Sequence, residues 1–168
     1  MKRTATVVTC VAAFLFTTAL TGCSSGSGDA SGEGEGHGPV SSSASPSKPA
    51  TVDTKSAGKL GTILVDDKGR TLYLFLADKK NKSNCSGACA KAWPPLLTKG
   101  DAKPGKGVEK KLLDTTKRSG GGTQVTYNGH PLYYYVGDSK PGQTNGQDLD
   151  QFGAEWYVLN AKGKQVGS

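Results

Sequence analysis

Two cysteines separated by three residues are the side chains of this sequence with the widest range of possible chemistry. Cys85 and Cys89 would lie about one helical turn apart, with Cα atoms near the 6 Å that a disulfide accepts. The C-x-x-x-C spacing differs from the redox motif C-x-x-C, and no histidine follows for covalent haem attachment. Two thiolates are also too few for a closed zinc site. We expect a disulfide, with redox or metal roles as alternatives.

Two aspartates, each at the end of an aromatic run, are the next candidates. Asp78 and Asp138 could form a paired cation site, for example for calcium, or accept backbone N–H groups as turn residues. Calcium needs six or more oxygen ligands, and the acidic residues after the second run match no known loop. We therefore expect turn acids and no metal site.

Aromatic side chains recur at alternate positions before these aspartates. Tyr73 and Phe75 precede the first, and Tyr133 and Tyr135 precede the second. Such rows could stack on sugars or peptides, but aromatic residues on strands more often pack across the sheet, and we expect packing. His130 stands beside a predicted turn, and no catalytic or phosphate-binding motif is present. We expect neither a catalytic residue nor a cofactor.

These candidates belong to an internal repeat. Residues 65–78 and 125–138 align without a gap, 60 positions apart, and Gly69 matches Gly129. Trp93 and Trp156 follow at comparable places, three residues out of register. One supersecondary unit has been duplicated.

Each copy is predicted to form a β-hairpin. Asp66 to Gly69 and Asn128-Gly129 provide the turns, and the second is the strongest short hairpin signal because both positions tolerate positive φ. The returning strands are apolar on both faces, which indicates central strands. A third hairpin is expected over residues 156–166. Between the copies, one or two helical turns are expected around Ser86–Trp93, ended by two prolines.

The predicted fold is mainly β: a duplicated β-hairpin repeat forming one small antiparallel-sheet domain over residues 58–168. Copy 1 spans about 61–97 and copy 2 about 122–160. Residues 23–57 are rich in Ser, Gly and Pro, with too little apolar surface to offset the entropy of ordering. We expect this segment to be a flexible linker.

The N-terminus has the pattern of an export signal. Lys2 and Arg3 precede an apolar stretch over residues 7–20, shorter than the roughly 20 residues that span a bilayer. Residues 20–23, Leu-Thr-Gly-Cys, resemble the lipobox of bacterial lipoproteins. This resemblance implies a signal peptide over residues 1–22 and lipid, such as palmitate, on Cys23, anchoring the chain at the extracytoplasmic face of the cell membrane.

Export also bears on the cysteines and on the charge. Cys10 would leave with the signal and Cys23 would carry the lipid, so Cys85 and Cys89 would be the thiols left in an oxidising compartment, where a disulfide is the default. The signal contains two of the 21 basic residues and none of the 14 acidic ones. The remaining excess of basic residues is small and scattered, which argues against nucleic-acid binding.

The aromatic runs carry a family resemblance. Residues 73–78 and 133–138 both fit Y-x-[FWY]-x-x-D, and residues 85–96 fit C-x-G-x-C-A-x-x-W-P-P-L. With the lipobox, this resembles predicted bacterial lipoproteins built on a secreted repeat with the Yx(FWY)xxD motif. The second copy lacks the cysteines, with Asn145 and Gly146 in their region. The family has no established activity, so the resemblance implies class and location.

Two functional hypotheses follow. The first is a non-catalytic binding module that contacts an envelope protein, polymer or small ligand. The second is a redox or electron-transfer accessory that uses Cys85 and Cys89 or a bound metal.

Overall fold

The computed structural model describes residues 46–79 and 81–167, and the mainly β fold predicted from the sequence is confirmed. The elements in chain order are β1 (Thr51–Ser56), η1 (Gly58–Leu60), β2 (Thr62–Asp66), β3 (Tyr73–Phe75), α1 (Ala88–Ala92), β4 (Lys103–Pro104), η2 (Lys110–Leu112), β5 (Leu113–Lys117), β6 (Thr123–Tyr127), β7 (His130–Pro131), β8 (Leu149–Gln151) and β9 (Ala154–Val158). The short helix expected around Ser86–Trp93 is α1, which ends before the two prolines.

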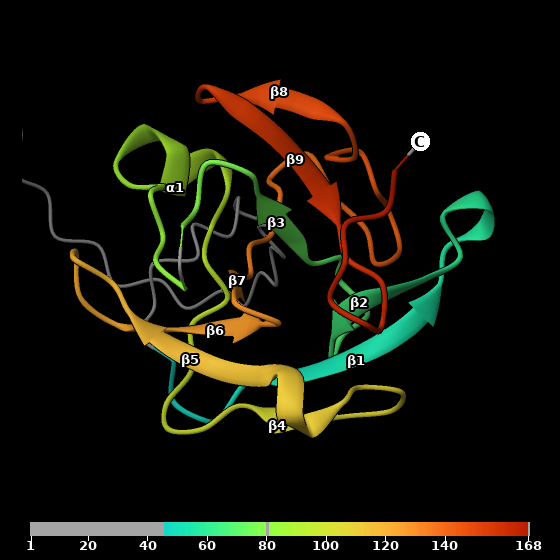
Figure 1. Ribbon diagram of the computed structural model, residues 1–168, viewed down its shortest axis with the longest axis horizontal. Coiled ribbons are helices and arrows are strands. Elements are labelled where there is room, and N and C mark those ends of the chain that lie inside the picture. Colours follow the sequence, from blue (N-terminus) through green and yellow to red (C-terminus); the bar gives the residue numbers. More distant parts are fainter. Residues whose placement is uncertain (1–45, 80, 168) are drawn as a thin grey trace, which may run out of the picture. The chain divides into compact units, whose positions relative to one another are not determined.

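In the described residues the strands form three small sheets, which answers a question that the sequence left open, namely how the strands of the two repeats are distributed between sheets. Their orders are β2-β1-β4, β3-β9-β8 and β5-β6-β7. In Figure 1, β1 and β5 follow each other along one side, and the β8–β9 hairpin lies at the opposite side. Between the described strands, every pairing is antiparallel, as predicted, except the short parallel pairing of β1 with β4.

The folded domain begins earlier than predicted. β1 lies inside the range 23–57 that we expected to be a flexible linker, and it pairs with β2 over five residues. Val52 is fully buried in this strand. The linker prediction was therefore wrong for residues 51–56, because a Thr- and Lys-containing strand needs only one buried side chain when a neighbour supplies its hydrogen bonds.

The two repeats are each built on an antiparallel strand pair. β1 pairs with β2 in the first copy, and β5 pairs with β6 in the second. Each pair leads through a tight turn into the motif segment. The predicted first hairpin is paired only next to its turn, where Val65 bridges Thr71 and the Leu72 N–H donates to the Leu64 carbonyl. The chain then leaves β2, and β3 pairs with β9 instead.

The turns have the conformations that their residues predict. Asn128 and Gly129 both have positive φ, 49° and 80°, which only Gly and a few polar residues adopt readily. In the first copy, the Asp66 carboxylate accepts the backbone N–H groups of Lys68 and Arg70. The third predicted hairpin closes through a bridge between Leu159 and Gln165.

The motif strands separate two apolar clusters, as their two apolar faces predict. Tyr73 and Phe75 belong to one cluster, and Leu72 and Leu74 belong to the other. The last apolar residues of the two motif segments are not buried, however, since Leu76 and Val136 are 41% and 60% exposed. In residues 46–79 and 81–167, no helix has the length and apolar character needed to cross a membrane.

Candidate functional site

The two motif tyrosines meet at the centre of the domain. Tyr73 and Tyr133 form an antiparallel bridge in which each backbone N–H donates to the other carbonyl, at 2.9 and 3.0 Å. Both residues are fully buried. The two copies of the motif therefore lie side by side in opposite directions.

The side chains of the two motifs exchange partners. The Tyr73 hydroxyl donates to the Asp138 carboxylate at 2.6 Å, and the Tyr133 hydroxyl donates to Asp78 at 2.7 Å. The tyrosine of each copy thus binds the aspartate of the other copy. This cross-pairing gives the Y-x-[FWY]-x-x-D pattern a physical meaning, because one repeat alone contains only half of each bond.

The aspartates also order their own turns, as expected for turn acids. Asp78 accepts the backbone N–H of Asn84, and Asp138 accepts that of Asn145. Each asparagine then donates its side-chain amide to the carbonyl just before the aspartate, Ala77 or Gly137. The matching Asp–Asn arrangement, with slightly different spacings, was a sequence signal for this shared role.

Burial changes the acidity of the cross-paired groups. Desolvation raises the pKa values of Asp78 and Asp138, although the hydrogen bonds that each carboxylate accepts oppose the rise. Desolvation, together with the neighbouring carboxylates, also raises the pKa values of Tyr73 and Tyr133. Both phenols therefore remain protonated donors, which suits a structural role better than proton transfer near neutral pH.

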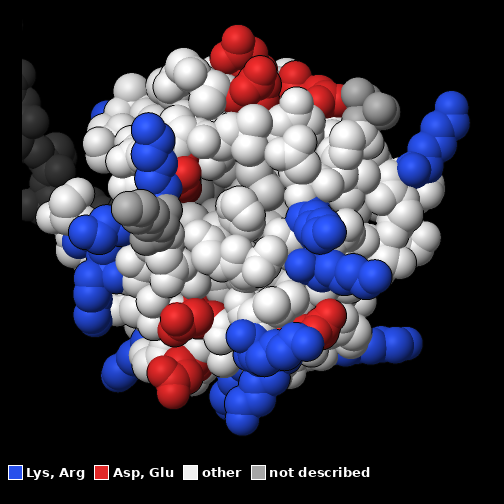
Figure 2. Space-filling model, in the orientation of Figure 1, with Lys and Arg blue, Asp and Glu red and all other residues white. Residues whose placement is uncertain are grey.

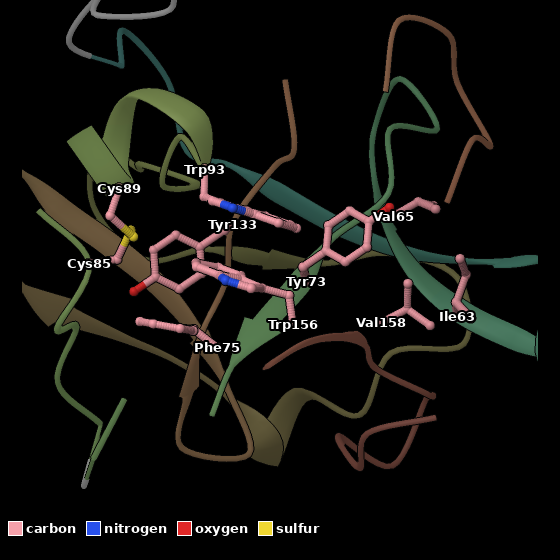
Figure 3. Packing of buried hydrophobic residues seen from close by; sticks show 10 residues of the cluster. All are labelled: Ile63, Val65, Tyr73, Phe75, Cys85, Cys89, Trp93, Tyr133, Trp156 and Val158. Carbon is pink, nitrogen blue, oxygen red and sulfur yellow. A yellow bond between two sulfur atoms is a disulfide. The ribbon is translucent and has the colours of Figure 1, made fainter. Parts of the chain in front are cut away.

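A column of four stacked rings runs beside the tyrosine bridge (Figure 3 shows three of them). Its order is Phe75, Trp156, Trp93 and Tyr135, with centroid separations of 4.1, 3.9 and 4.2 Å. The motif aromatic of each copy stacks on the tryptophan of the other. Phe75, Trp93 and Trp156 are buried, so these rings pack the core instead of forming a platform for sugars or peptides.

Two residues outside the motifs support the column. Both indole N–H groups donate to Gln151, one to its side-chain oxygen and the other to its backbone carbonyl. Gly146 lies against Trp93 and Tyr73, where an added Cβ would come within 2.9 Å of either ring. Its backbone N–H also donates to the Tyr73 hydroxyl. No motif or spacing in the sequence pointed to Gln151.

The predicted cysteine pair is joined in a disulfide at the start of α1, with Cα atoms 5.2 Å apart. Cys85 and Cys89 are 1% and 6% exposed and belong to the same apolar cluster as the tryptophans. Arg118, from the second repeat, donates to the carbonyl of Cys85 and to Ser83. The disulfide thus fixes a loop that the other copy also holds.

A groove of about 550 Å³ opens near the start of the domain. Arg70 at its wall pairs with the buried Asp66 through Nε and Nη2, at 2.8 and 2.7 Å. The guanidinium lies over the ring of Tyr134, 4.0 Å from its centroid. Sequence reasoning missed this group of three residues. Arg70 follows a turn of the first repeat and Tyr134 lies in the second motif, and nothing in the sequence indicated that they are close together.

The remaining candidates are Cys23 and the titratable side chains outside the motifs. Cys23 lies outside the described residues. Within residues 46–79 and 81–167, no three His, Cys, Asp or Glu side chains are grouped so that they could hold a metal ion. Figure 2 shows basic side chains scattered over the visible face, one group of acidic side chains over β8 and β9, and further acidic side chains lower on the same face. Asp150 on β8 and Glu155 on β9 are direct cross-strand partners.

One comparison identifies a family of related sequences. A family model named Lipoprotein_15 and described as "Secreted repeat of unknown function" matches residues 54–97 and 114–160. The first match starts in β1 and the second in β5, so both include the strand pair that precedes the motif. No curated protein and no solved structure matches the chain.

Proposed function

Since the chain belongs to the family of secreted lipoprotein repeats of unknown function, we propose that it is a lipid-anchored binding module of the cell envelope and not an enzyme. Cys23 carries the lipid, and the domain faces the outside of the cytoplasmic membrane. The domain contacts an envelope protein, polymer or small ligand.

One observation carries this proposal. The motif side chains that could have performed chemistry are committed to each other inside the core, through the Tyr73–Asp138 and Tyr133–Asp78 bonds. Polar groups fully paired in this way stabilise a fold and specify its packing. The open groove beside Arg70, in contrast, has the size of sites that take small ligands.

The competing function is a redox accessory that uses Cys85 and Cys89. Reactive cysteines are usually partly exposed and lie in electropositive surroundings, whereas buried cysteines are inert. Both sulfur-bearing side chains are buried here. Burial therefore favours the binding function over thiol exchange.

Anchoring is tested by replacing Cys23 in the full chain, expressed in its native host with labelled palmitate. We expect wild type to carry the label in the membrane fraction and Cys23→Ala to lose the label and leave that fraction. Two acyl chains on one residue give stable anchoring, because each buried CH₂ contributes about 0.8 kcal/mol. Wild-type protein without label would overturn the anchor.

Binding is tested by co-sedimentation of the mature chain, made without lipid, with envelope fragments from a host lacking the protein. We expect saturable binding by wild type and by a folded Cys85→Ser, Cys89→Ser double variant. Absence of saturable binding would overturn the binding function. Loss of a thiol-dependent activity in the folded double variant would favour the redox accessory.

A further inference from the structure

The groove beside Arg70 is built from four separate segments. The chain entering the domain forms one wall, with Pro46, Lys48 and Pro49, and the turn after β2 forms the other. Leu96 and Leu97 contribute from the segment that follows the two prolines. Tyr134, from the second repeat, forms the remaining part of the lining, so the groove lies where the two repeats meet.

Arg70 is held in place before any ligand arrives. Its Nε and Nη2 atoms bond to Asp66, and Nη2 also donates to the Tyr134 hydroxyl at 2.9 Å. The Tyr134 hydroxyl in turn donates to Asp66 at 3.1 Å. Asp66 is only 3% exposed, so this carboxylate anchors the guanidinium from behind.

One edge of the guanidinium remains available. The described residues offer no acceptor to the Nη1 atom of Arg70, and its side chain is 43% exposed. A planar arginine that is stacked on an aromatic ring loses little entropy when it forms a further hydrogen bond. The free edge is thus a preorganised donor for an anionic oxygen.

The charges around the groove select the kind of anion. Lys48, Lys68 and Arg70 supply three positive charges, and Asp66 and Asp67 supply two negative ones. Lys48 and Asp67 already pair at 3.1 Å. The net excess of one positive charge matches a monoanion such as a carboxylate better than a doubly charged phosphate.

We propose that this groove binds the free C-terminal carboxylate of a short peptide. The carboxylate lies against Nη1 of Arg70 and near the Lys68 ammonium, and the peptide backbone runs along the apolar lining. The apolar lining formed by Pro49, Leu96 and Leu97 suits small aliphatic side chains. This inference rests on the proposed binding function and assigns its ligand class and its site.

The test measures chemical-shift changes in the mature chain, made without lipid, during titration with N-acetyl-Ala-Ala. We expect saturable shifts confined to the groove residues. The C-terminal amide of the same peptide, which lacks the charge, should bind at least tenfold more weakly. Inorganic phosphate should produce no saturable shift in the groove. Equal binding of acid and amide, or preferential binding of phosphate, would overturn the assignment.

Variants separate the groove from other cationic positions. Arg70→Lys keeps the charge but loses the planar fork, and Lys68→Gln removes an exposed charge without touching the buried pair. Each should weaken acid binding at least threefold. Lys91→Gln, an exposed position on α1, is the matched control and should leave binding unchanged. Equal effects of Lys68→Gln and Lys91→Gln would also contradict the site.

Envelope co-sedimentation distinguishes failure of the peptide site from failure of the binding function. If the wild-type chain binds envelope fragments but not the peptide acid, the groove assignment fails and the binding function stands. If it binds neither, both fail. If Lys68→Gln weakens peptide and envelope binding together, the groove is the site of both.

Discussion

Tyr73 donates its phenolic hydrogen to Asp138, a residue 65 positions later in the chain. The partner of Tyr73 is therefore in the second repeat, although an aspartate of the same motif, Asp78, lies five residues away from it in its own repeat. The reverse bond from Tyr133 to Asp78 completes the exchange. The motif residues therefore join the two repeats of the chain, and each tyrosine forms a pair with the aspartate of the other repeat.

The first prediction concerns the energy of this exchange. Tyr73→Phe should lower the free energy of unfolding by about 2 kcal/mol, because a hydrogen bond to a charged group is lost and a partly buried carboxylate loses a donor. Urea unfolding of Tyr73→Phe, Asp138→Ala and the double variant should give a coupling energy of about 1 kcal/mol or more.

The control for this cycle pairs the same tyrosine with the aspartate of its own repeat. Tyr73→Phe and Asp78→Ala should combine with a coupling energy below about 0.5 kcal/mol, because these side chains share no hydrogen bond. Stronger coupling between Tyr73 and Asp78 than between Tyr73 and Asp138 would contradict the cross-pairing.

The second prediction concerns the contact between Gly146 and the ring column. Gly146→Ala should destabilise the domain by about 1 to 3 kcal/mol, because the new Cβ would meet Trp93 at 2.7 Å and the rings are closely packed. Near-ultraviolet circular dichroism should change as the indoles shift. Gly120→Ala, where the added Cβ meets no atom within 4 Å, should leave both stability and spectrum nearly unchanged. Equal stability of the two variants would contradict the packing.

The third prediction concerns the disulfide. Cys85→Ala combined with Cys89→Ala should cost about 2 kcal/mol, because a bridge that closes so short a loop removes little entropy from the unfolded chain. Urea unfolding under oxidising conditions measures the loss, and reduction of wild type should give a similar decrease. Complete unfolding of the double variant would show that the bridge is required for the fold.

The fourth prediction concerns pH. The pKa values of Asp78 and Asp138 are raised above 3.8 in the folded state, so the native protein binds these protons more tightly than the unfolded chain. Their contribution to stability is therefore fully present below pH 3.8 and is lost as pH rises through the folded-state values. Asp78→Asn should flatten this part of the stability profile, measured by urea unfolding at a series of pH values. An unchanged slope would contradict the shift.

The sequence predicted the local features that depend on few residues. The Asn128-Gly129 turn, the helical turn before the two prolines and the two-faced motif strands all follow from backbone preference or side-chain alternation. The disulfide in the structure likewise agrees with the cysteine spacing. The repeat itself was visible because the copies keep the same spacing without a gap.

The sequence did not predict which partners the strands would choose. Alternation in β3 does not specify β9 as its neighbour, since that pairing depends on residues more than 80 positions apart. β1 was also missed, because a strand with one buried valine has almost the composition of a linker. The stack of Arg70 on Tyr134 was missed because the two residues approach each other only after the repeats have joined.

The exchanged bonds also bear on how two copies of the protein would interact at high concentration. The core residues of each repeat pack and bond with those of the other repeat. A second molecule of the protein contains the same partner residues. Two chains that opened between their repeats would offer each other the same tyrosine, aspartate and tryptophan partners. An intertwined dimer would then reproduce all the cross-repeat bonds of the monomer, so domain swapping is the form of self-association to which this architecture is open.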